Sequence, residues 1–197
     1  MVLRSGTAYS CFVSTPETVT RSRTRQAIID AAITVWASDP GASLADIAAA
    51  AGVGRTTLHR YFAERQDLLS TLATEIAGRL AEADRRAKLE DGTGLEATLR
   101  LVREYHDLGD ALSFMFAGQV DVYAAFSAVA APCTANSAIA RGMADGSLDD
   151  QLTPEWVESM MWSALYSAWA YTNEHGGSRH ESLRLVVRSL EGAVGRR

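Results

Sequence analysis

Apolar residues recur at three- and four-residue steps along most of the chain, which is the spacing of an amphipathic α-helix. No segment shows the sustained two-residue alternation that is typical of a half-buried β-strand. The pattern predicts helices over about 24–37, 66–88 and 154–175, and a last helix that Ser178 caps and that reaches about residue 194. Less regular helical segments are expected between them. The sequence therefore predicts an all-α fold.

Two short helices joined by a tight turn are predicted near residue 50. Ser43 and Asp46 have the spacing of a capping box, and Gly52 lies where the turn favours a residue that tolerates positive φ. In the second helix Leu58 and Phe62 share an inward face, four residues apart. The outward face carries donors and cations: Arg55, Thr56, Thr57, His59, Arg60 and Tyr61. An apolar-backed helix with this outer face fits the DNA major groove.

This stretch resembles the helix-turn-helix of the tetracycline-repressor (TetR) family of bacterial transcription regulators. The family's pattern is roughly IAxxAGVSxxTLYxHFxSKxxLL, and the chain has IAAAAGVGRTTLHRYFAERQDLL over residues 47–69. The chain departs from the pattern at Gly54, His59, Tyr61 and Arg65. Each of the last three keeps a donor or a cation. The resemblance covers about residues 24–70 well and the remainder only in architecture.

The resemblance implies an N-terminal three-helix DNA-binding domain followed by a helical ligand-binding and dimerisation domain. Residues 1–20 are rich in Ser and Thr without periodicity, which indicates a flexible arm. The predicted division is therefore an arm over 1–20, the helix-turn-helix domain over 21–67 and the second domain over 68–197. The implied function is that of a homodimeric repressor that binds a palindromic double-stranded DNA operator and is released by a small molecule.

The exposed polar residues of the helix-turn-helix have two expected roles. The residues toward the groove-facing N-terminal side of the second helix are expected to read base edges: Arg55, Thr56 and His59. Others match family positions that hold phosphates: Ser43, Thr57, Tyr61 and Arg65. Upstream, Arg21, Arg23 and Arg25 either follow the phosphate backbone or enter the minor groove, or form a solvated charge run.

Charge is distributed unevenly along the chain. The net charge is −5, but the chain through Arg65 has seven basic and five acidic residues, which is net +2. The remainder has twelve basic and nineteen acidic residues, which is net −7. An acidic body with a mildly basic head suits a protein that touches DNA at one end only.

The second domain is rich in aromatic side chains, which are the usual lining of a small-molecule pocket. We expect an apolar or aromatic effector and a pocket drawn from Tyr105, His106, Phe114, Phe116, Tyr123, Phe126, Trp162, Tyr166 and Trp169. Plain core packing is the alternative interpretation for each of these residues taken singly.

Residues 159–173 form a run of fifteen uncharged residues that must be buried nearly all round. The resemblance implies that the last two long helices pair with their copies in a homodimer. The last helix supplies a matching apolar stripe of Leu183, Val186, Val187 and Leu190. A charge at Ala168 is expected to weaken the dimer if that residue faces the partner.

Other kinds of site find little support in the sequence. His106 and Asp110 are four residues apart, as metal ligands on a helix can be, but Gly109 lies between them and no second cluster is visible. No hydrolase, zinc-protease or phosphate-loop motif is present, so we expect no catalytic residue, metal or cofactor. The alternative to a regulator is a small helical enzyme or carrier that retains the helix-turn-helix as a relic. The intact donor face favours the regulator.

A membrane location is not expected. The uncharged run 122–140 contains Pro132, Asn136 and several Ser and Thr residues, which make it too polar and too broken to span a bilayer. The first 20 residues lack a continuous apolar segment, so they do not resemble a signal peptide. Cys11 and Cys133 lie far apart and indicate neither a disulfide framework nor a metal site. Together these features predict a protein of the reducing cytoplasm.

Overall fold

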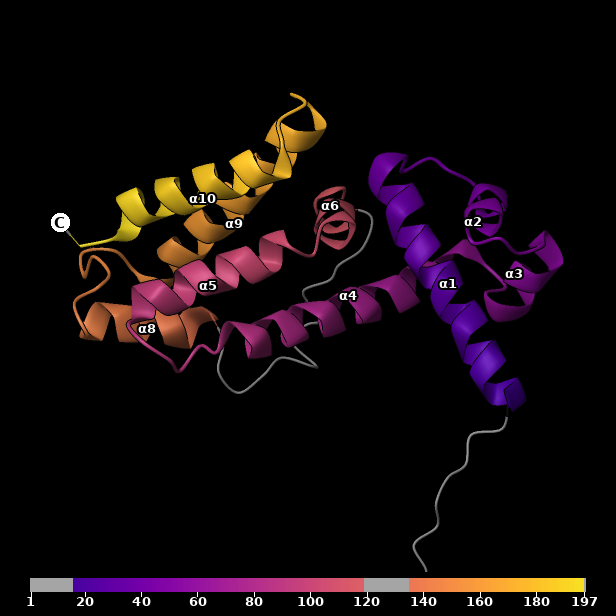
Figure 1. Ribbon diagram of the computed structural model, residues 1–197, viewed down its shortest axis with the longest axis horizontal. Coiled ribbons are helices and arrows are strands. Elements are labelled where there is room, and N and C mark those ends of the chain that lie inside the picture. The colour runs from indigo at the N-terminus through magenta and orange to yellow at the C-terminus, as the bar shows by residue number, and fades with distance from the viewer. Residues whose placement is uncertain (1–15, 119–134, 197) are drawn as a thin grey trace, which may run out of the picture.

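The computed structural model describes residues 16–118 and 135–196, and within these ranges the all-α prediction is confirmed (Figure 1). The elements in chain order are α1 (Pro16–Ser38), α2 (Leu44–Ala50), α3 (Arg55–Tyr61), α4 (Arg65–Ala87), α5 (Gly94–His106), α6 (Asp110–Phe116), α8 (Ala135–Ala144), α9 (Pro154–Asn173) and α10 (Arg179–Val194). Among the described residues, extended pairing is limited to one isolated antiparallel bridge between Leu148 and Gly195.

The helices form a head and a body that α4 connects (Figure 1). Helices α1, α2 and α3 make the head, and α4 runs from beside α1 along α5 into the body. In the body α10 packs mainly on α9, and α8 packs on α5 and α9. Helix α6 packs against α1, so the body touches the head directly at this point as well as through α4.

The head folds as its hydrophobic pattern predicts. Ser43 and Asp46 form the expected capping box, with Asp46 Oδ2 accepting from the Ser43 backbone N–H at 2.8 Å. This hydrogen bonding with Ser43 lowers the pKa of Asp46. Gly52 has φ 67°, in the left-handed region that its predicted turn position requires. Leu58 and Phe62 are buried in the same core as Trp36, which is itself fully buried.

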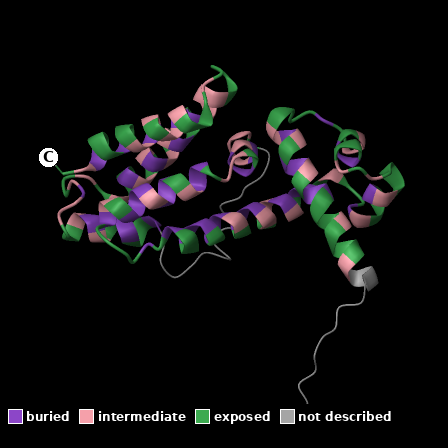
Figure 2. Cartoon of the chain, viewed as in Figure 1, coloured by how far each residue is buried: buried purple, intermediate pink, exposed green. Residues whose placement is uncertain are grey.

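The long helices agree with prediction to within two residues, except at the start of α1. Helix α4 spans Arg65–Ala87, one residue earlier than expected at each end, and its predicted stripe of Leu69, Leu72, Ile76, Leu80, Ala83 and Ala87 is buried (Figure 2). Ser178 caps α10 as predicted, and Thr153 caps α9. Helix α1 begins at Pro16 rather than near residue 24, because proline is well tolerated in the first helical turn. Residues 16–20, which the predicted arm included, are therefore helical.

Some predictions fall on residues outside the described ranges. These are the first 15 residues of the arm and the pocket candidates Tyr123 and Phe126. Most of the uncharged run 122–140 also lies there. Among the described helices, none is both long enough and apolar enough to cross a membrane.

Candidate functional site

Helix α3 presents the polar face that the sequence predicts. Its buried residue is Leu58, while Arg55, Thr56 and His59 are exposed and Thr57 is half-buried. The preceding residue, Gly54, caps the helix with extended backbone and leaves the first backbone N–H groups without a side-chain partner. The three predicted base-reading residues therefore lie together and open to solvent at the start and middle of one helix.

Hydrogen bonding assigns the proton on His59. Its Nδ1 lies 3.3 Å from the Ala63 carbonyl oxygen. Because a carbonyl only accepts, Nδ1 carries the proton, and in the neutral ring Nε2 is left as an acceptor. His59 can therefore take a donor such as the amino group of adenine or cytosine.

Arginine side chains surround the half-buried Tyr61 ring at the end of α3. The Arg60 Cζ atom lies 5.7 Å from the ring centroid, and the Arg21 Cζ atom of α1 lies 6.0 Å from it. Arg25 lies over the neighbouring Phe62 ring at 5.5 Å. Two of the three arginines that precede the motif thus lie beside α3, and they extend its basic surface along α1.

The body contains a pocket of about 160 Å³ between the α5–α6 turn and helices α9 and α10. Of the predicted pocket residues, His106 and Trp169 line it. Asp110, Leu112 and Arg179 line it too, and none of these three is among the predicted pocket residues. Gly109, with φ 57°, makes the turn between α5 and α6 that forms one wall.

The remaining aromatic candidates pack elsewhere in the body. Phe116, Tyr166 and Trp169 form one cluster, in which the Tyr166 and Trp169 centroids are 5.1 Å apart and the Phe116 and Tyr166 centroids 5.4 Å. Phe114 is fully buried and stacks on Trp36 of the head, with centroids 6.3 Å apart. These two sets place aromatic rings beside the pocket and at the head–body contact.

Tyr105 belongs to a separate buried group. Its ring stacks on Trp162 with centroids 5.1 Å apart, and its hydroxyl donates to Asp84 Oδ1 at 2.7 Å. Asp84 is 3% exposed, and its Oδ2 has no hydrogen-bond partner among the described residues. Burial raises the pKa of Asp84 to about 6, although the Tyr105 hydrogen bond opposes this shift. Periodicity gives no signal for such a group, because Asp84 occupies a buried position of α4 beside alanines.

His106 and Asp110, four residues apart, bind different partners. His106 Nε2 lies 2.9 Å from Ser182 Oγ, and Asp110 Oδ2 accepts from Thr34 Oγ1 at 2.8 Å, so the two side chains have separate partners. In the described ranges, no three His, Cys, Asp or Glu residues lie together as ligands of a metal ion would.

Comparison with known proteins bears on both regions. Residues 28–72 match the family model "Bacterial regulatory proteins, tetR family". The chain is 34% identical over 179 residues to the HTH-type transcriptional repressor LfrR of Mycolicibacterium smegmatis, which covers 90% of this chain and 94% of LfrR. The chain belongs to the TetR family. Its helix-turn-helix is therefore a DNA-binding element, and the regulator hypothesis is favoured over an enzyme or carrier.

Solved structures of TetR-family proteins share the fold. The crystal structure of LfrR in complex with proflavine matches with a TM-score of 0.68 at 34% identity, covering 87% of this chain and 96% of LfrR. A TetR-family regulator from Rhodococcus sp. matches with a TM-score of 0.66 at 17% identity, covering 86% and 97% of the two chains. The second likeness concerns the fold alone.

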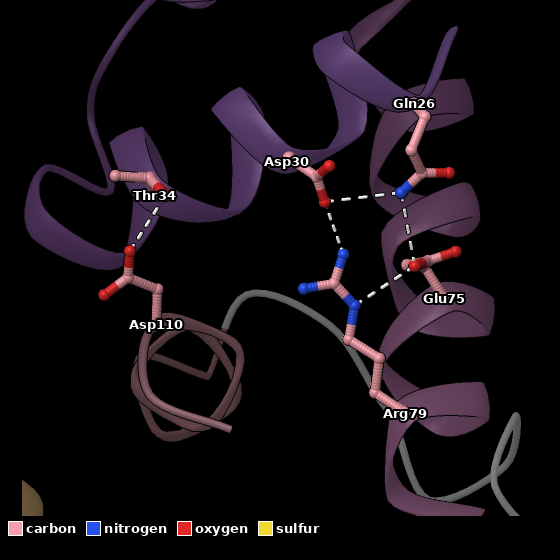
Figure 3. A network of polar contacts seen from close by, with 6 residues as sticks. All are labelled: Gln26, Asp30, Thr34, Glu75, Arg79 and Asp110. Carbon is pink, nitrogen blue, oxygen red and sulfur yellow. Dashed lines mark hydrogen bonds and ion pairs between the residues drawn. The ribbon is translucent and has the colours of Figure 1, made fainter. Parts of the chain in front are cut away.

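A polar network joins the TetR-family head to the body (Figure 3). Arg79 of α4 pairs with Asp30 of α1 and with Glu75 of its own helix, and Gln26 of α1 donates to both carboxylates. Further along the same face of α1, Thr34 donates to Asp110 at the start of α6. Because Asp110 also lines the 160 Å³ pocket, one side chain touches both the pocket and the head.

Ala168 is only 4% exposed and lines both the pocket and a groove between α9 and α10. A contact of this residue with a partner subunit stays a prediction. Val186 and Leu190 of the predicted α10 stripe are also buried within the chain. The exposed part of α9 carries Ser163, Ser167 and the 47% exposed Tyr166.

Arg65 makes interior contacts that its predicted phosphate role did not anticipate. Its Nη1 donates to the Ala42 carbonyl and its Nη2 to the Pro40 carbonyl, each at 2.9 Å. Its Cζ lies 4.2 Å from the centroid of Trp36, whose Nε1 also donates to the Ala42 carbonyl. Arg65 thus fastens the α1–α2 loop to the start of α4, while its contact with phosphate stays a prediction.

Arg65→Ala is expected to destabilise the head by ~2–4 kcal/mol, because two charged hydrogen bonds and a cation–π contact are lost together. Urea unfolding followed by tryptophan fluorescence measures this loss. Arg60→Ala is the matched control, since Arg60 is exposed and contacts the Tyr61 ring. Equal stability of the two variants would leave the phosphate role as the main one for Arg65.

Proposed function

We propose that the protein is a ligand-responsive transcriptional repressor. In this proposal a homodimer binds a palindromic operator through α3 of each subunit, and a small aromatic molecule releases it by binding in the body. The observation that carries the proposal is the hydrogen bond from Thr34 of the head to Asp110 of the pocket. It gives a bound ligand a direct contact to the DNA-binding unit.

The DNA-binding part of the proposal is supported by the exposed face of α3. Arg55, Thr56 and His59 would read base edges, since all three are exposed on α3 and stand free of the head's core. Ser43, Thr57, Tyr61 and Arg65 would hold phosphates, with Arg21 and Arg25 adding positive charge beside them. Ser43 would do so while its hydroxyl also serves the capping box of α2.

The ligand-binding part of the proposal is supported by the pocket and by the similarity to LfrR. LfrR has been crystallised with proflavine, a planar aromatic molecule. In this chain the Trp169 ring lines the pocket and Phe116 and Tyr166 pack against that ring, so an aromatic effector would find a stacking surface. By linkage, an effector that weakens operator binding must itself be bound more weakly when the operator is present.

The dimerisation part of the proposal is supported by the surface that α9 and α10 share. A groove of about 270 Å³ runs between them and is lined by small or apolar residues, among them Ala164, Ser167, Leu185 and Ser189. Burial of this groove against its copy would cover the exposed uncharged part of α9. Two heads would then be held at a fixed spacing, as half-sites about one DNA turn apart require.

The function is tested by selecting bound sequences from random double-stranded DNA with the purified protein. A palindromic sequence should emerge, and proflavine should lower the affinity for it measured by fluorescence anisotropy. DNA without the palindrome should bind far more weakly at the same salt concentration. Recovery of no preferred sequence would refute the repressor proposal.

Thr34→Val is expected to weaken the link between effector and operator. Valine keeps the shape of threonine and removes the donor to Asp110, so the ratio of operator affinities without and with proflavine should shrink by up to about tenfold. The measurement is that ratio in the variant and in the wild type. Thr74→Val is the matched control, because Thr74 is exposed on α4 and its hydroxyl donates to the Ser70 carbonyl of the same helix. An unchanged ratio in Thr34→Val would show that coupling runs elsewhere.

A further inference from the structure

A buried carboxylate lies where α4, the helix that connects the head to the body, packs on α5. Asp84 of α4 is 3% exposed, and its Oδ1 accepts from the Tyr105 hydroxyl of α5 at 2.7 Å. Its Oδ2 is buried and has no hydrogen-bond partner among the described residues. The Tyr105 ring stacks on Trp162 of α9. One carboxyl group therefore lies among three helices with one of its two oxygens unsatisfied, although buried polar atoms are nearly always paired.

The charged side chains nearby do little to stabilise an ionised Asp84. The positive charge of Arg85 favours the ionised form, but its guanidinium forms an ion pair with Glu82. A buried anion loses far more hydration than a neutral carboxyl group does, so the ionised form is the costly one. Three further charged side chains lie near the group on the three helices: Arg86 and Glu104, which pair with each other at 2.7 Å, and Glu158, whose negative charge acts on Tyr105.

The folded protein holds the proton of this carboxyl group more tightly than the unfolded chain does. Burial raises the pKa of Asp84 from 3.8 to about 6, against the opposing effect of the Tyr105 hydrogen bond. Burial also raises the pKa of Tyr105, so its hydroxyl keeps its proton and remains the donor. A carboxyl group whose pKa is raised by folding contributes stability that is fully present below the unfolded value and is lost as the pH rises through the folded one.

We propose that Asp84 is a proton-binding switch that sets how firmly α4 is held on α5. With the proton bound, a neutral carboxyl group is buried and α4 packs as the structure shows. Without it, the buried charge favours looser arrangements in which Oδ2 meets water. Because α4 joins the head to the body, the switch acts on the helix that sets their relative position. The effect needs neither operator nor effector, so it goes beyond the proposed function.

Asp84→Asn tests the proposal, because asparagine has the shape of a protonated aspartic acid and does not ionise. Relative to this variant, the folding equilibrium constant of the wild type, measured by urea unfolding of the full-length protein, should fall about tenfold between about pH 5 and about pH 7.5. The histidines titrate in both proteins, so the comparison isolates Asp84. Glu90→Gln is the matched control, since Glu90 is exposed just after α4, and it should follow the wild type. The same pH dependence in the wild type and in Asp84→Asn would overturn the proposal.

Tyr105→Phe provides a second test with a direction of its own. Loss of the hydroxyl removes the hydrogen bond that favours the ionised form, so the pKa of Asp84 should rise further. The carboxyl carbon of Asp84, identified in ¹³C spectra by its absence from Asp84→Asn, reports this pKa directly. Its titration midpoint should lie near 6 in the wild type and higher in Tyr105→Phe. A wild-type midpoint at the ordinary value of 3.8, or one that Tyr105→Phe leaves unchanged, would contradict the proposed role of the pair.

Hydrogen exchange distinguishes loosening of α4 from a general loss of stability. After correction for the intrinsic exchange rate, backbone amides of α4 and α5 around Asp84 and Tyr105 should lose about tenfold in protection over the same pH range, and those of α10 should lose less. In Asp84→Asn the protection of α4 should not depend on pH. A loss of equal size throughout the wild-type chain, or none in α4, would show that protonation does not act at this contact.

Discussion

Ser167→Arg should convert the protein from a dimer to a folded monomer and reduce its affinity for a palindromic operator by at least about 100-fold. Ser167 is exposed on α9 and lines the groove that α9 forms with α10. In a symmetric dimer each subunit would place one arginine in the same apolar contact. An unpaired charge buried in this way makes the free energy of dimerisation less favourable by several kcal/mol. The resulting monomer has one head and can bind only one half-site.

Light scattering and DNA binding measure the two parts of this expectation. The wild type should have twice the chain mass of 21.2 kDa, and the variant should approach that chain mass while its circular dichroism stays helical. Ala140→Arg is the matched control, because Ala140 is exposed on α8 away from this groove. A dimeric Ser167→Arg protein would show that the subunits associate through another surface.

The exposed face of α9 could be predicted only in part from the sequence. The uncharged run of α9 predicts a helix that is buried on most sides, and the structure confirms the helix. The sequence does not predict which face of that helix is exposed, because no charged residue marks a solvent side between residues 159 and 173. Ala168 and Ser167 are neighbours in the sequence, yet only the structure shows that Ala168 is buried between the pocket and the groove, whereas Ser167 is exposed at the groove.

The head was predictable in more detail because its signals are local. The capping box of Ser43 and Asp46, the turn at Gly52 and the inward pair Leu58 and Phe62 each depend on spacings of a few residues. The interior contacts of Arg65 were not predictable in this way. Its carbonyl partners lie 23 and 25 residues earlier and meet it only once α1, α2 and α4 have packed.

The same limit applies to the pocket. The sequence marks aromatic residues of the second domain as a set but does not separate those that line a pocket from those that fill the core. Tyr105 and Phe114 proved to be core residues, whereas Asp110 proved to join the pocket to Thr34. That pairing spans 76 residues and one helix of each unit, so no short motif carries it.

Arg55→Ala should lower affinity for the selected operator by ~1–3 kcal/mol for each α3, and by ~2–6 kcal/mol for a dimer that places the residue in both half-sites. Arg55 is the first residue of α3, exposed, and next to the free backbone N–H groups that follow Gly54. From there a guanidinium most often takes guanine through O6 and N7. Removal of this side chain should also reduce the discrimination between bases at one base pair of each half-site.

The contrast between operator and random DNA decides whether Arg55 reads bases or holds phosphates. Base readout predicts a large loss on the operator, a small loss on random DNA and a nearly unchanged salt dependence. Arg60→Ala is the matched control on the same helix, since Arg60 is exposed but lies beside the Tyr61 ring. Because Arg60 is not among the predicted base-reading residues, Arg60→Ala should change the affinity for the operator and for random DNA by a similar factor. If Arg55→Ala proved equally harmful on both kinds of DNA, Arg55 would belong with the phosphate-binding residues, and specificity would have to come from Thr56 and His59.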